Sequence, residues 1–295
     1  MLVFFLLIQS GLIAYVYKSE LFETPVLAKT VFLEVDINKT DRLELHSESG
    51  KPVVVKKNNG KWIMPDYQNL PVSKGKVEAL LQKLTQSRVS APVGTSNAVA
   101  ARFGVSQTNF KRKLLLYHQG KLQAQVLIGK VTTQETHYAR IENDNRIYTI
   151  RLSLDHLPAK QESWFDHQIL QPELPLIRLE SADFVLFQTN NEWQLDKAKK
   201  NEQLDPSQVK RLLNYIKYLQ VISIEKDVDA SAKPAFYFIV NDKSGMVRYD
   251  FYKRGSKLII KSSRSALYYQ LADYLGKVLV TFNRTSLIFV RKMQE

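Results

Sequence analysis

Cysteine is absent from the 295-residue sequence, and this absence removes several kinds of chemistry at once. The chain cannot form disulfides, cannot use a thiolate as a nucleophile, and cannot hold zinc or an iron–sulfur cluster through sulfur ligands. A cysteine-free chain is compatible with an oxidising compartment, where free thiols are a hazard, but the same absence also arises by chance. The compartment therefore has to be inferred from other features.

Catalytic and nucleotide-binding motifs are missing as well. The sequence has no Gly-x-Ser-x-Gly segment and no glycine-rich loop ending in Gly-Lys-Ser/Thr. Histidine is scarce, and no two of the five histidines flank a glutamate at the spacing of a zinc protease helix. His156 and His167, on either side of Trp164 and Asp166, would form a three-ligand metal site only if this loop folded back, and surface positions are commoner for isolated histidines. We therefore predict no catalytic residue, no cofactor and no metal ion, and a protein that is not an enzyme.

Long apolar runs are also few, and one of them stands out because Leu2 to Tyr17 contains no charged side chain. A helix of this length spans about 24 Å, slightly less than the roughly 30 Å hydrocarbon core of a bilayer. The run predicts a transmembrane anchor over residues 1–17 that contacts the lipid bilayer. A cleaved signal peptide and a buried core helix are the alternatives, and Val26-Leu27-Ala28 has the small-residue spacing of a cleavage site. Because Lys18 and Lys29 follow the run and no basic residue precedes it, charge alone leaves its orientation open.

Basic residues exceed acidic ones, with 42 Lys and Arg against 29 Asp and Glu and a formal net charge of +13. This balance favours anionic partners such as acidic lipid or a cell-wall polymer. The charge is scattered, however, and the densest runs, Lys111 to Lys113 and Lys197 to Lys200, lack interleaved aromatic residues. We therefore expect no nucleic-acid binding.

Two stretches of the chain repeat one pattern. "NNGKWIMPD" at residues 58–66 and "TNNEWQLDK" at residues 189–197 each place a tryptophan in a short apolar strand ahead of a helix. Both helices carry apolar residues at positions i, i+3, i+4 and i+7, which indicates one buried stripe. Asp205 and Pro206 predict the start of the second helix, and Ser73 is the expected cap of the first. The predicted core of the repeat consists of Trp62, Val77, Leu80, Leu81, Leu84, Trp193, Val209, Leu212, Leu213 and Ile216.

Antiparallel strands follow each helix, with turns at Gln119-Gly120, at 143–145 and at 243–245. Each half then closes with a short helix near Asp155 or Leu271. Hairpins in place of singly alternating strands and long helices indicate an α+β fold. We predict an N-terminal transmembrane helix followed by two tandem, similar α+β modules with antiparallel sheets. The expected boundaries are 1–17 for the anchor, 18–30 for a linker, 31–170 for the first module, 171–176 for a second linker, and 177–292 for the second module.

Three short motifs in the first half resemble those of a bacterial family. They are Phe103-Gly104-Val105, Leu127-Ile128-Gly129, and Tyr138-Ala139-Arg140 followed by Tyr148. On these motifs the chain resembles the uncharacterised, membrane-anchored proteins grouped as domain of unknown function 4340. The chain departs from the family pattern at Ser73-Lys74-Gly75, where an acidic residue usually begins the first helix.

The resemblance implies a single-pass inner-membrane protein whose body lies in the periplasm. It also implies a non-catalytic accessory or scaffold of an ABC-type transport system of the gliding-motility kind, with permease and ATPase subunits as partners. The alternative, taken from the charge, is a binding module for anionic envelope components. The cargo, the identity of the partner and the oligomeric state are not readable from the residues.

Overall fold

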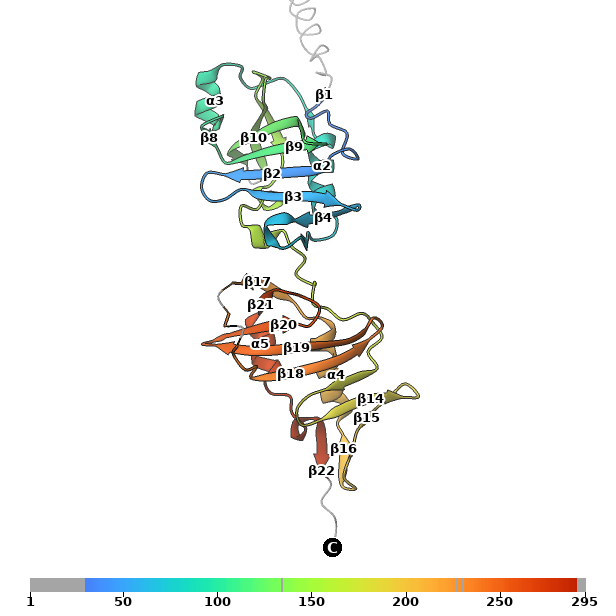
Figure 1. Cartoon of the computed structure of the whole chain (residues 1–295). Coiled ribbons are helices and arrows are strands. Elements are labelled where there is room, and N and C mark those ends of the chain that lie inside the picture. Colours follow the sequence, from blue (N-terminus) through green and yellow to red (C-terminus); the bar gives the residue numbers. More distant parts are fainter. Residues whose placement is uncertain (1–29, 134, 227, 230, 291–295) are drawn as a thin grey trace, which may run out of the picture. The chain divides into compact units, whose positions relative to one another are not determined.

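The computed structural model describes residues 30–290 except 134, 227 and 230, and these residues form two compact units (Figure 1). The first unit contains 30–69 and 75–160, and the second contains 70–74 and 161–290. The predicted anchor and most of the linker after it lie outside the described residues. Within the described part, no helix combines the length and the apolar character that a membrane crossing needs.

The first unit is built mainly of antiparallel strands. Its elements, in chain order, are β1 (Thr30–Val31), β2 (Arg42–Ser47), β3 (Val53–Asn58), β4 (Lys61–Met64), η1 (Pro65–Tyr67), α2 (Lys76–Gln86), β6 (Arg88–Val89), α3 (Asn97–Phe103), β7 (Val105–Ser106), β8 (Asn109–Phe110), β9 (Arg112–His118), β10 (Lys121–Thr133), β11 (Thr136–Ile141), β12 (Tyr148–Arg151) and η2 (Leu154–His156).

The second unit has the same character. It contains β5 (Leu70–Pro71), η3 (Gln161–Ser163), β13 (Arg178–Glu180), β14 (Val185–Thr189), β15 (Glu192–Leu195), β16 (Glu202–Leu204), α4 (Pro206–Lys217), β17 (Val221–Glu225), β18 (Phe236–Asp242), β19 (Gly245–Arg254), β20 (Lys257–Ser262), β21 (Tyr268–Leu271), α5 (Asp273–Leu279), η4 (Thr285–Leu287) and β22 (Ile288–Val290). The antiparallel sheets with their helices confirm the α+β class.

The main sheets of the two units arrange their strands in the same order. Seven of the eight strands in each sheet follow one order: β4-β3-β2-β9-β10-β11-β12 in the first and β15-β14-β13-β18-β19-β20-β21 in the second, where β17 follows β21. In each unit the chain forms a three-stranded meander and then a helix, α2 or α4. It returns to the sheet beside the first strand of the meander and forms four more strands there. Seven strands of each sheet therefore correspond in order.

The repeated asparagines lie in the turns of the two tryptophan hairpins. Asn59 and Gly60 connect β3 to β4 with φ angles of 46° and 78°, and Asn190 and Asn191 connect β14 to β15 with φ angles of 51° and 66°. Two-residue hairpin turns with positive φ at both positions match the right-handed twist of the strands, and asparagine and glycine tolerate this conformation best. The shared sequence pattern thus encodes the same tight turn in both units.

The two helices start differently. Asp205 caps α4, because its Oδ1 accepts hydrogen bonds from the main-chain N–H groups of Ser207 at 2.8 Å and Gln208 at 3.2 Å. The prediction that Ser73 caps α2 is wrong. Gly75 occupies that position with φ 74° and no side-chain bond, while the Ser73 hydroxyl donates to the Phe165 carbonyl oxygen at 2.9 Å. A glycine in the left-handed region lets the chain enter the helix two residues later than a serine cap would.

Candidate binding groove

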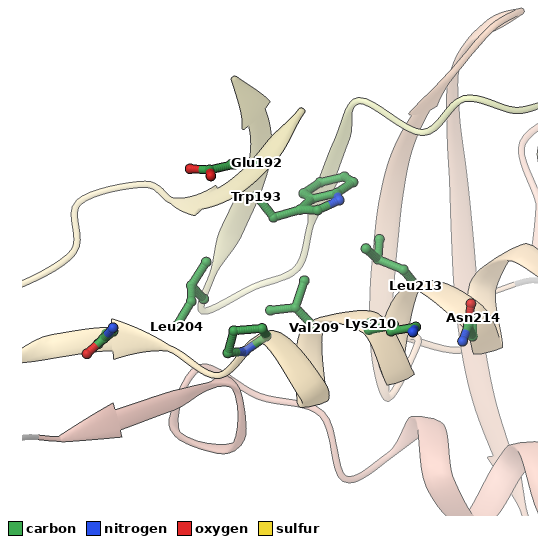
Figure 2. Close-up of a pocket in the computed structure, with 9 residues that line it drawn as sticks. Glu192, Trp193, Leu204, Val209, Lys210, Leu213 and Asn214 are labelled. Carbon is green, nitrogen blue, oxygen red and sulfur yellow. The ribbon is translucent and has the colours of Figure 1, made fainter. Parts of the chain in front are cut away.

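An open groove of about 620 Å³ lies in the second unit, between the β14–β15 hairpin and α4 (Figure 2). Its floor is apolar and is formed by Trp193, Leu204, Pro206, Val209 and Leu213. The remaining lining residues are polar: Glu192, Gln203, Lys210 and Asn214. A concave apolar floor with a few polar groups at its border is the usual composition of a binding site.

The groove takes its shape from the way α4 packs. Val209, Leu212 and Ile216 are buried and hold one side of α4 inside the unit. Leu213 follows them at the spacing of the same stripe but is only half-buried, and it faces the groove beside Lys210. The helix therefore divides its apolar residues between the core and an accessible surface.

The corresponding tryptophans differ in exposure. Trp62 on β4 pairs with Lys57 in the hairpin register and is 6% exposed, so the first unit encloses it. Trp193 on β15 pairs with Gln188 in the same hairpin geometry but is only half-buried. Figure 2 shows its ring extending from β15 toward α4. The same structural position is thus a core residue in one unit and part of an accessible surface in the other.

The strand that carries Trp193 has a free edge. β15 is the last strand at its end of the sheet, and no described strand pairs with its outer side. The main-chain N–H of Asp196 donates to the Val185 carbonyl at 2.9 Å, which fixes the alternation of the ladder. In an antiparallel pair, every second residue directs its N–H and C=O away from the partner strand. By this alternation, the main-chain groups of Trp193 and Leu195 point outward.

A basic loop follows the strand that carries Trp193. Lys197, Lys199 and Lys200 are exposed in the loop that joins β15 to β16, and both strands line the groove. This loop is held from below by Arg284, whose guanidinium donates to the Lys197 carbonyl at 2.8 Å and to Glu202 Oε2 at 2.7 Å. These bonds from Arg284 hold the pKa of the Glu202 carboxyl below its usual range. Glu202 therefore stays ionised and is paired with Arg284, and the ion pairs of the described residues include no lysine of this loop.

The predicted repeat core is distributed between the two units. Val77, Leu80, Leu81 and Leu84 are buried on α2, at 0–2% exposure. On α4 the corresponding stripe is buried except at Leu213. Sequence reasoning did not identify the rim residues Glu192, Lys210 and Asn214, although the lysine run at 197–200 was visible. Which residues lie at the rim depends on how β15 and α4 pack against each other, and hydrophobic periodicity does not predict that packing.

The histidines that were considered as metal ligands make contacts with the main chain. Nδ1 of His167 lies 2.6 Å from the Val221 carbonyl oxygen, and Nδ1 of His156 lies 3.3 Å from the Ser153 carbonyl oxygen. Among the described residues, no group of three or more His, Asp or Glu side chains is placed to hold a metal ion.

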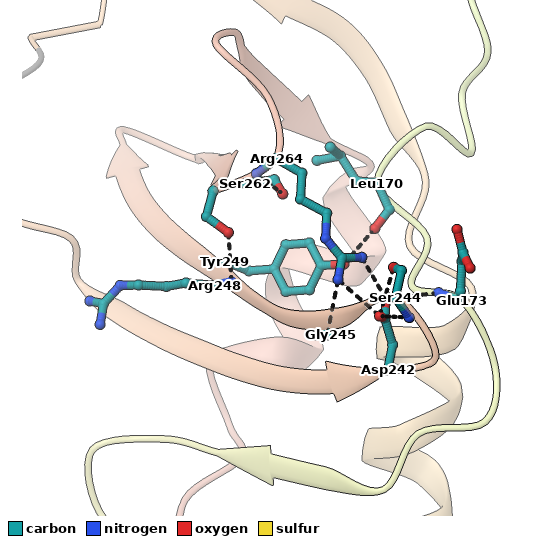
Figure 3. A network of polar contacts seen from close by, with 10 residues as sticks. Leu170, Glu173, Asp242, Ser244, Gly245, Arg248, Tyr249, Ser262 and Arg264 are labelled. Atoms are coloured by element: carbon teal, nitrogen blue, oxygen red, sulfur yellow. Dashed lines mark hydrogen bonds and ion pairs between the residues drawn. The ribbon is translucent and has the colours of Figure 1, made fainter.

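A polar network lies elsewhere in the second unit (Figure 3). Asp242 accepts two hydrogen bonds from the guanidinium of Arg264, at 2.6 and 2.9 Å, and further bonds from the main-chain N–H groups of Glu173 and Ser244, both at 2.9 Å. The bonds from Arg264 hold the pKa of the Asp242 carboxyl well below its usual range. Since all four groups are satisfied by protein partners, this arrangement serves to fix the segment before β13 to the β18–β19 turn.

The hydroxyl of Tyr249 performs a similar task. It donates to the main-chain carbonyl of Leu170 at 2.8 Å, and burial raises the pKa of this tyrosine. The phenol therefore stays protonated and keeps its role as a donor. Neither polar arrangement leaves a reactive group facing an open cavity.

The short motifs of the first half converge on α3. Phe103 at the end of α3 stacks on Tyr138 of β11, with ring centroids 3.9 Å apart. Gly129 on β10 runs so close to the end of α3 that an added Cβ would lie 2.3 Å from the Phe103 carbonyl oxygen and 2.6 Å from that of Gly104. The motif glycines thus permit close packing of a helix end on a strand. Their explanation is structural.

A comparison with protein families matches residues 62–236 to "Domain of unknown function (DUF4340)". The chain belongs to this family. The matched region of the DUF4340 protein includes α2, the α3 motifs, the groove and its basic loop. Comparisons with curated proteins and with solved structures found no match.

Proposed function

We propose that this DUF4340 protein is a non-catalytic binding or scaffold protein that serves as an accessory of an ABC-type transport system, anchored to the inner membrane by residues 2–17 with its body in the periplasm. The observation that carries the binding role is the groove, because it offers an apolar floor beside a free strand edge. The transport setting and the topology rest on the family resemblance and on the apolar N-terminal run.

The shared order of seven strands in the two sheets supports a further part of this proposal. We infer that the two units are tandem copies of one module. A duplicated module offers two related surfaces, and one copy can keep a closed core while the other opens a surface for a partner. The difference between Trp62 and Trp193 is of this kind.

The test is purification of the full-length chain from its native membranes in mild detergent, followed by mass spectrometry. Stoichiometric recovery of a permease and its ATPase is the expected result. A matched chain lacking residues 2–17 should lose membrane association, which checks the anchor separately. Recovery of the full-length protein without any transporter subunit would contradict a stable accessory role.

A second candidate follows from the net charge of +13. A module that binds acidic lipid or an anionic cell-wall polymer through long-range charge should lose affinity steeply between about 0.05 and 0.5 M salt, because the Debye screening length shortens over this range. Its binding should also survive removal of residues 2–17. Co-sedimentation with phosphatidylglycerol vesicles across these salt concentrations distinguishes this candidate from the transporter role.

A further inference from the structure

We propose that the groove binds an extended, acidic segment of a partner protein, which adds as a strand to the free edge of β15 and places an apolar side chain on the floor between Trp193 and α4. This proposal deepens the binding role proposed above and rests on it. It names the chemistry of the partner and the way the partner is held.

The strand edge supplies the first argument. The outward main-chain groups of Trp193 and Leu195 have no described strand as a partner, and an unpaired edge is a ready template for another extended chain. Peptide recognition by strand addition draws its affinity from main-chain hydrogen bonds and its specificity from pockets for alternate side chains. β15 provides such an edge, and the groove beside it provides such a pocket.

The floor supplies the second argument. Side chains of an added strand alternate between the two faces of the sheet, so every second residue of the partner would point toward α4. There it meets Val209, the half-buried Leu213 and the Trp193 ring. An aliphatic or aromatic side chain buries these surfaces, whereas a charged one would be desolvated without a partner.

The charges supply the third argument and indicate that the partner segment is acidic. Lys210 lines the groove beside one exposed carboxylate, Glu192, and three further exposed lysines lie in the loop at 197–200 that follows β15. The carboxylate of Glu202, at the end of this loop, is already paired with Arg284. Acidic residues in the partner would be attracted to these lysines, and this attraction would raise the rate of association.

The experiment selects a displayed library of random octapeptides on the full-length chain in detergent. We expect the selected peptides to alternate apolar residues with other residues and to be enriched in Asp and Glu. Leu213→Asp should weaken their binding by at least about tenfold, because it puts a charge on the apolar floor. Lys210→Glu should weaken it by about threefold at physiological salt. Tyr218→Ala, at an exposed position just after α4 and outside the groove, should leave binding unchanged.

Two further probes separate strand addition from other modes. A selected peptide that is N-methylated at alternate residues keeps its side chains but loses its main-chain donors, and it should bind at least about tenfold more weakly if added as a strand. Phosphatidylglycerol vesicles should not displace the peptide. Equal binding of the methylated peptide, displacement by the vesicles, indifference to Leu213→Asp, or a selection that yields no binding peptide would each overturn the proposal.

These outcomes are independent of the transporter test. A chain that binds acidic peptides in the groove but purifies without a permease loses the transporter role and keeps the groove assignment. A chain that purifies with a permease but shows no peptide binding loses the groove assignment alone.

Discussion

Removing Arg264 should destabilise the second unit strongly, because its partner Asp242 has no exposed side-chain surface. The guanidinium donates two charge-assisted hydrogen bonds, at 2.6 and 2.9 Å, and such bonds contribute about 1.5–3 kcal/mol each when buried. The Arg264 side chain is 37% exposed, so water replaces part of this interaction and the sum must be reduced. We therefore expect Arg264→Ala to lower the free energy of unfolding by about 2–3 kcal/mol.

The assay is denaturant unfolding of the full-length chain followed by tryptophan fluorescence. In a Trp62→Phe background the signal comes only from the second unit, where Trp164 and Trp193 lie. Arg178→Ala is the matched control, because its pair with Glu180 at 3.1 Å is open to water, with side chains 44% and 32% exposed, and should contribute at most about 1 kcal/mol.

The same variant has a pH signature. The pKa of Asp242 is lower in the folded chain than in the unfolded chain, so its contribution is complete above the ordinary carboxyl pKa of about 4 and is lost as the pH falls toward the folded-state pKa. The difference between the wild-type chain and Arg264→Ala should therefore shrink between about pH 5 and pH 3. A difference below about 1 kcal/mol at pH 7, or one that is constant with pH, would refute the reasoning.

Three further changes test the fold. Asp205→Ala removes the cap of α4 and should cost about 1 kcal/mol of unfolding free energy by denaturant titration; no change would mean that the cap bonds are replaced by water. Gly129→Ala forces a Cβ against two carbonyl oxygens at the end of α3 and should lower stability by about 1–3 kcal/mol, with hydrogen exchange rising in α3 first; undiminished protection there would contradict the close approach. Tyr249→Phe leaves a buried carbonyl unpaired and should cost about 1–2 kcal/mol in thermal or denaturant unfolding, whereas a neutral result would require another donor at that carbonyl.

Local patterns in the sequence predicted several elements correctly. The i, i+3, i+4, i+7 stripes gave α2 and α4, and Asp205 followed by Pro206 gave the start of α4. Turn residues gave the hairpin at Gln119-Gly120, where the two φ angles are 49° and 77°. These features depend on residues within a few positions of one another, so their physical causes are contained in a short window.

The sequence carries one further local signal, at α3. Ser96 caps α3 by accepting a hydrogen bond from the Val99 N–H at 3.3 Å, and Gly104 ends it with φ 70°. A serine followed by a short apolar segment and a glycine is an ordinary pattern for a helix. The seven residues of α3 are too few for a periodic stripe to stand out, so periodicity alone does not predict this helix.

The sequence by itself determined the fold class, the two amphipathic helices, the tight turns and the absence of cysteine chemistry, because each follows from composition or from neighbours along the chain. Only the tertiary structure decided the strand order, the pairing of Asp242 with Arg264, and the groove. Leu81 and Leu213 occupy the same place in the two stripes, yet Leu81 is 2% exposed and Leu213 is half-buried. The exposure of a side chain depends on which distant segments pack over it, and that packing is a property of the folded unit.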